Sequence, residues 1–143
     1  MYRGTLLAES LRLGVDLVVP GLRMTRCGRH DVSASATLTQ PKTWTFIHFE
    51  VDDDRVDELA ASLSSTLLSD DGWYADFRSD REHFVVFAGK IFRYPKGDTA
   101  ARDQVIRYGR DAGTPAHQLD WEDVNPSAAD PEAGYPETNG TTR

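Results

Sequence analysis

Two histidines and two carboxylates are the side chains with the clearest capacity for chemistry. His48 and Glu50 lie two residues apart in an apolar stretch, and Asp76 and His83 flank a turn signal. An imidazole titrates near neutral pH and a carboxylate can orient it, so such a set could share a proton or ligate a divalent metal. Spacing alone does not bring the four together. Cross-strand ion pairs on a half-exposed sheet face are the simpler interpretation, and no metal ligand set is assigned.

The strands that would carry these side chains are marked by β-forming residues. Residues 44–51 read Trp-Thr-Phe-Ile-His-Phe-Glu-Val, the strongest strand signal in the chain. Further strands are predicted over residues 5–8, 16–19, 73–78, 83–87 and 91–94, the last two joined by a two-residue turn at Gly89-Lys90. The polar stretch 23–42 is expected to form a long loop or irregular edge structure.

Two amphipathic helices complete the pattern. The acidic run 52–54 can cap the first, in which apolar residues recur at helical spacing as far as Leu67. The second begins at Asp98 or Thr99 and ends before Gly113. This order of elements predicts an α+β fold, a mostly antiparallel sheet with two helices packed on one face. A ferredoxin-like relative is one option.

The hairpin registers sort the aromatic block 73–94 into two faces. Residues paired across antiparallel strands share a face, and the turn at Gly89-Lys90 would place Val85 opposite Tyr94. One face is apolar and expected to meet the helices. The mixed face continues onto strand 44–51 and carries the candidate ligand-binding residues His48, Glu50, Tyr74, Asp76, His83 and Tyr94. A small molecule or a protein partner is expected there.

Composition limits the classes of function. The chain has 143 residues, a formal charge of −7 and a single cysteine, Cys27. Its length suits one domain over residues 1–121, followed by an acidic tail over 122–143 that is predicted to be disordered. The acidic balance disfavours nucleic acid as a partner, and one cysteine excludes an intramolecular disulfide. No apolar run suits a membrane span or a signal peptide, so a cytoplasmic protein is expected.

The chain resembles a group of small uncharacterised bacterial proteins. The shared segments are Met1-Tyr2-Arg3-Gly4, the strand Trp73-Tyr74-Ala75-Asp76-Phe77, a hairpin like 85–94, and the closing Tyr108-Gly109, Gly113-Thr114-Pro115 and Gln118-Leu119-Asp120. The resemblance covers most of residues 1–121 and implies one domain. No activity is established for that group, so it implies no functional residue.

The sequence leaves the activity open. It has no Gly-rich phosphate loop, no Ser nucleophile elbow and no Cys-x-x-Cys pair, so no cofactor is assigned. The first hypothesis is therefore a non-catalytic accessory module that binds a small ligand or a protein. The alternative is a small enzyme that uses the histidine and carboxylate face, either with or without a bound metal ion. A homo-oligomer remains open.

Overall fold

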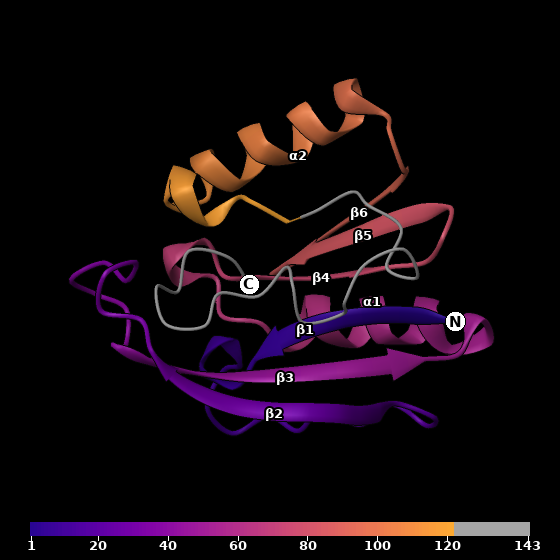
Figure 1. Cartoon of the computed structure of the whole chain (residues 1–143), viewed down its shortest axis with the longest axis horizontal. Helices are drawn as coiled ribbons and strands as arrows, with labels where there is room; N and C mark the ends of the chain where they lie inside the picture. The colour runs from indigo at the N-terminus through magenta and orange to yellow at the C-terminus, as the bar shows by residue number, and fades with distance from the viewer. Residues whose placement is uncertain (122–143) are drawn as a thin grey trace.

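The computed structural model describes residues 1–121, which form a six-stranded antiparallel sheet and two α-helices (Figure 1). The strands are β1 (Tyr2–Leu7), β2 (Arg23–Asp31), β3 (Thr43–Val51), β4 (Tyr74–Arg78), β5 (Glu82–Phe87) and β6 (Lys90–Pro95). The helices are α1 (Val56–Thr66) and α2 (Thr99–Asp111). The strand order β2-β3-β1-β4-β5-β6 confirms the α+β class and the antiparallel sheet. The prediction for the acidic tail lies outside the described residues.

A ferredoxin-like relationship stays an expectation. That fold follows the order βαββαβ, whereas this chain places three strands before each helix. Neither described helix has the length and apolar character needed to cross a bilayer.

The two helices pack on opposite faces of the sheet, so the expectation of a single covered face is wrong. Leu59 and Leu63 of α1 share a core with Phe77 and Phe84, whereas Val105 of α2 belongs to a separate core. That second core contains Tyr74, Val85, Phe87, Tyr94, Val105, Leu119 and Trp121. Large side chains of β4 and β5 are buried on both faces, and each buried apolar side chain is worth roughly 1.5–3 kcal/mol, so both faces require a cover. We call the α1 side the first face and the α2 side the second face.

The turn between β5 and β6 differs by one residue from the prediction. Phe87 pairs with Lys90, so Ala88 and Gly89 occupy the two central positions, and Gly89 has φ of 73°. Glycine thus supplies the positive φ at the second central position, as in a type II turn. Val85 therefore pairs with Phe92, and Tyr94 pairs with His83. The register differs by two residues, and because side chains alternate with period two, the predicted faces are unchanged.

The second strand of the sheet is not where the sequence placed it. Residues 16–19 are irregular, whereas β2 lies in the stretch 23–42 that was expected to be a long loop or irregular edge structure. As the outermost strand, β2 pairs only with β3, and its side chains are exposed or half-buried. An edge strand needs no apolar alternation and commonly carries charges, which explains why its sequence did not predict a strand.

The N-termini of α1 and α2 are capped differently. Asp98 caps α2, accepting a hydrogen bond of 3.0 Å from the N–H of Ala101, as predicted. A 3₁₀ turn over Asp53–Arg55 precedes α1, and no side chain caps that helix. Asp53 instead forms an ion pair with the amine of Met1 and so links the start of α1 to the start of β1.

Candidate functional site

The register places all six predicted site residues on the second face. Across the sheet, one row runs from His48 through Thr5 to Asp76, and the next runs from Glu50 through Arg3 and Arg78 to His83 and Tyr94. Tyr74 follows one row further along β4. The prediction that these side chains share a face is therefore confirmed. Their exposure is not what the sequence suggested.

Asp76 and His83 form a buried pair. Nε2 of His83 lies 3.2 Å from Oδ2 of Asp76, and the two residues are 0% and 3% exposed, respectively. The His83 ring stacks on Tyr94 with ring centres 5.8 Å apart. The second oxygen of Asp76, Oδ1, is buried and has no hydrogen-bond partner among the described residues. The pair could transfer a proton only where a reacting group reaches it.

Trp121 covers this pair. Its Nε1–H donates a hydrogen bond of 2.7 Å to the hydroxyl of Tyr94, and its ring meets Tyr74 edge-on with centroids 5.5 Å apart. The Arg102 guanidinium lies 4.7 Å from the Trp121 ring centre and donates to its backbone carbonyl at 2.6 Å. This end of the second face is thus a second hydrophobic core rather than a half-exposed surface. The sequence interpretation gave Trp121 no role, although the closely spaced Leu119 and Trp121 were a signal for it.

His48 lies on the other side of the same row. It is 9% exposed, and its Nδ1 lies 3.1 Å from Oγ1 of Thr5. The pKa of His48 is lowered to about 4, mainly by burial and also by the charges of Arg26 and His30, while Asp76 opposes them. The imidazole is therefore neutral at pH 7. Its predicted neighbour Glu50 forms an ion pair of 3.1 Å with Nε of Arg3.

The structure does not bring the two histidines to one metal position. His48 on β3 and His83 on β5 are separated by β1 and β4, three strand spacings or about 14 Å between backbones. Zinc and similar ions hold nitrogen ligands at about 2 Å. Among residues 1–121, no group of three or more His, Cys, Asp or Glu side chains is placed to hold a metal ion.

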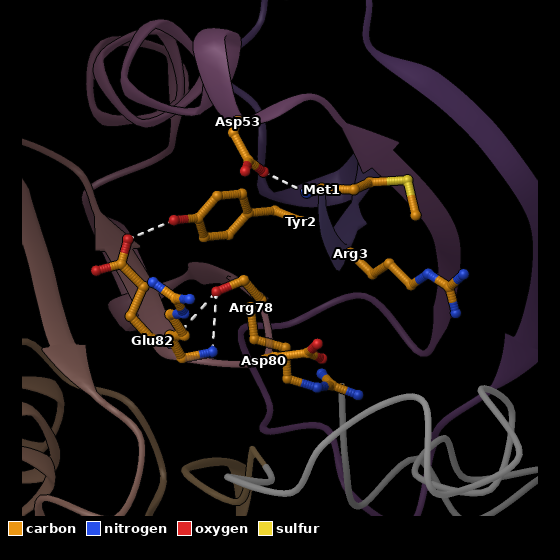
Figure 2. Close-up of a pocket in the computed structure, with 9 residues that line it drawn as sticks. Met1, Tyr2, Arg3, Asp53, Arg78, Asp80 and Glu82 are labelled. Carbon is orange, nitrogen blue, oxygen red and sulfur yellow. Dashed lines mark hydrogen bonds and ion pairs between the residues drawn. The ribbon is translucent and has the colours of Figure 1, made fainter.

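An open pocket lies where β1 begins and where β4 turns into β5 (Figure 2). Its volume is about 730 Å³. We call it the arginine pocket; its lining residues are Met1, Tyr2, Arg3, Asp53, Arg78, Ser79, Asp80, Arg81 and Glu82. Figure 2 shows that the amine of Met1 contacts Asp53 and the hydroxyl of Tyr2 contacts Glu82. These contacts engage Asp53 and Glu82, and Arg3 of the lining is paired with Glu50.

Two of the pocket's carboxylates are already engaged. Asp53 pairs with the Met1 amine, and Glu82 accepts hydrogen bonds from Arg93 at 2.6 and 2.9 Å. The bond from Arg93 is the largest cause lowering the pKa of Glu82, against the effect of burial, and the Tyr2 hydroxyl lowers it further. Glu82 is therefore ionised at neutral pH, with Arg93 as its counter-ion.

Within residues 1–121, Arg78 has no such counter-ion. Its Nε is buried and has no hydrogen-bond partner among the described residues. The residue directly opposite on β1 is Arg3, so two like charges face each other across neighbouring strands. Such a pair is unfavourable unless anions lie beside the guanidinium groups, and Glu50 supplies one to Arg3 but not to Arg78. The sequence placed Arg78 on the mixed face but did not single it out, and only the pairing of β1 with β4 reveals its neighbour.

Comparisons of the chain with protein-family models, with curated proteins and with solved structures found no match.

Proposed function

We propose that this protein is a non-catalytic binding module whose ligand is a small anion held in the arginine pocket. The observation that carries the proposal is the buried Nε of Arg78, which lies beside Arg3 and has no hydrogen-bond partner within residues 1–121. A buried charged donor without an acceptor costs free energy, and a bound carboxylate or phosphate would supply the missing acceptor. The volume of about 730 Å³ suits a small molecule.

The arrangement favours an anion with two charges or two acceptor groups. Guanidinium groups bind carboxylate and phosphate through paired N–H donors, and two of them on adjacent strands can hold both ends of a dicarboxylate or one phosphate group. Arg81 adds a third cationic side chain to the same lining, while Asp80 limits the net attraction. A phosphate monoester or a short dicarboxylate fits this balance of charge.

The alternative of an enzyme that uses the second-face histidines has less support. Its best feature is the Asp76–His83 pair with one unpartnered carboxylate oxygen. Both residues are buried, and the Trp121 ring packs against His83, which restricts a substrate's approach to them. A general base must come within hydrogen-bond reach of the proton it abstracts. The open arginine pocket meets the requirement of access, and the buried pair does not.

Replacing Arg78 tests the proposal. Phosphate and succinate should each bind the full-length protein at low ionic strength, and Arg78→Gln should weaken that binding by about tenfold or more, because a hydrogen bond to a charged group is worth roughly 1.5–3 kcal/mol. Calorimetric titration measures both affinities. Arg107→Gln, which removes an exposed arginine from α2, is the matched control and should leave binding unchanged.

Two results would contradict the proposal. One is the absence of binding by wild-type protein to both anions at about 10 mM, a concentration well above a Kd of about 1 mM, which corresponds to a binding free energy of about −4 kcal/mol. The other is an equal loss of affinity in Arg78→Gln and Arg107→Gln, which would indicate screening of net charge rather than a site.

A further inference from the structure

A second cavity lies on the first face, away from the arginine pocket. Its volume is about 420 Å³, and it is lined by residues of β1, β2, β3, α1 and the segment between β1 and β2. The lining is apolar apart from one carboxylate: Leu6, Leu11, Val15, Asp16, Leu17, Leu22, Met24, Ile47, Phe49, Leu59 and Leu63. We call it the aliphatic cavity.

The floor and the walls of this cavity differ in burial. Phe49, Leu59 and Leu63 form a floor that is fully part of the first core. Leu17 and Leu22 in the wall are only partly buried, and Met24 is 64% exposed. Large apolar side chains thus line a concave surface that is open to water, which is unfavourable until an apolar group fills it.

The outer wall is a segment that can move without breaking regular structure. Arg12 bonds to Thr66 through its backbone N–H at 2.9 Å, and Leu22 bonds to Val19 at 3.1 Å. Residues 13–18 lie outside the helices and strands, and none of them forms a backbone–backbone hydrogen bond with another described residue. Gly14 and Gly21, near the two ends, have φ of 84° and 80°. Glycine tolerates large changes of φ and ψ, so the wall can swing at these two points.

We propose that the aliphatic cavity binds one linear aliphatic ligand whose polar end is cationic, such as a long-chain amine. The apolar lining takes the chain, and the exposed Asp16, the only charged lining residue, attracts the cationic end. A single small ligand is the occupant rather than a second protein copy, because the cavity is concave and its floor residues Leu59 and Leu63 are 0% exposed, so a flat protein surface does not reach them.

The two methionines of the chain provide a direct test. Met24 lines the aliphatic cavity and Met1 lines the arginine pocket, so protein labelled with ¹³C in the methionine methyl groups gives one reporter for each. Decylamine, titrated below its micelle concentration into full-length protein, should shift the Met24 signal saturably and leave that of Met1 in place. Phosphate should affect Met1 alone, so each proposal can fail without the other.

Variants locate the ligand. Val15→Trp should fill the cavity and weaken decylamine binding at least tenfold, whereas Val18→Trp, on the same segment but 75% exposed and outside the lining, should leave it unchanged. Asp16→Asn should weaken decylamine several-fold and leave decanol unaffected, with Asp54→Asn, an exposed carboxylate outside the lining, as its control.

Several results would overturn the inference. The first is a Met24 signal that responds to neither decylamine nor decanol. The second is decanoate binding as tightly as decylamine. The third is a Val15→Trp variant that binds decylamine with wild-type affinity. Concentration-dependent dimerisation that alters the Met24 signal without ligand would assign the cavity to a second copy instead. If Val15→Trp does not fold, the wild-type titrations and Asp16→Asn still decide the question.

Discussion

At the scale of single residues, burial distinguishes side chains that the sequence treats alike. The prediction that Asp76 lies beside His83 is confirmed by their separation of 3.2 Å, because strand alternation and hairpin pairing depend only on local sequence. Their burial was not predictable, since the cover comes from Trp121, which reaches them only through the tertiary fold. Arg78 shows the same limit: its like-charged neighbour Arg3 lies on a strand far away in sequence.

His48 should make the protein less stable as the pH falls below neutral. Its folded pKa of about 4 lies below the ordinary value of 6.5, so the unfolded chain binds the proton more readily between these two values. Stability from this residue is therefore fully present above pH 6.5 and declines as the pH falls toward 4, by at most about 1.4 kcal/mol per pH unit.

Urea unfolding of wild type and His48→Gln at pH 4.5 and 7 measures this effect. The variant should show a smaller loss of unfolding free energy between the two values than wild type does. His117→Gln, which removes an exposed histidine, should keep the wild-type pH dependence. An unchanged slope in His48→Gln would show that other groups cause the acid sensitivity.

At the scale of elements, the sequence predicted those whose pattern is strong. The strand 44–51, the strands of the aromatic block and both helices appear close to their predicted positions, because apolar periodicity reports which side of an element is buried. The edge strand β2 was missed because an edge needs little apolar surface. The covering of both faces by α1 and α2 was missed as well. The second face of β4 and β5 mixes polar and aromatic residues, so its pattern did not show that a helix covers it.

Gly4 marks the close approach of β1 to β4, where the two halves of the sheet meet. A Cβ atom at this position would lie 2.2 Å from the backbone carbonyl oxygen of Asp76 and 2.5 Å from Cβ of Phe77. Neither atom can move without shifting β4, so Gly4→Ala should destabilise the protein by about 2–3 kcal/mol.

Gly28→Ala is the matched control for Gly4→Ala, since both glycines lie within strands. The nearest atom to a Cβ at Gly28 is the end of the His30 side chain, at 3.0 Å, which can rotate away. Its cost should stay below about 1 kcal/mol in the same urea unfolding experiment. Equal costs for the two variants would refute a tight β1–β4 contact.

At the scale of the whole molecule, the chain after α2 returns to the sheet and joins segments that are distant in sequence. The Thr114 hydroxyl donates to the carbonyl of Gly72 at 2.6 Å, and the Gln118 amide donates to the carbonyl of Ser35 at 3.1 Å. The carbonyl of Gln118 accepts from the Tyr74 hydroxyl. These bonds hold the second core closed over Asp76 and His83. Composition and periodicity carry no information about such long-range contacts, which is why residues 116–121 received no structural role from the sequence.

Trp121 should therefore determine how firmly α2 is attached. Trp121→Ala removes the ring between Tyr74 and Arg102 and leaves the Tyr94 hydroxyl without its indole donor, so the free energy of unfolding should fall by about 3–5 kcal/mol. Native-state hydrogen exchange should show amides of α2 becoming exposed well before those of α1, because α1 packs in the separate first core.

Trp121→Phe keeps an aromatic ring but loses the hydrogen bond to Tyr94, and its cost should be smaller, about 1–2 kcal/mol. If exchange in α1 and α2 accelerates equally in Trp121→Ala, the two cores unfold as one unit and Trp121 does not hold α2 separately.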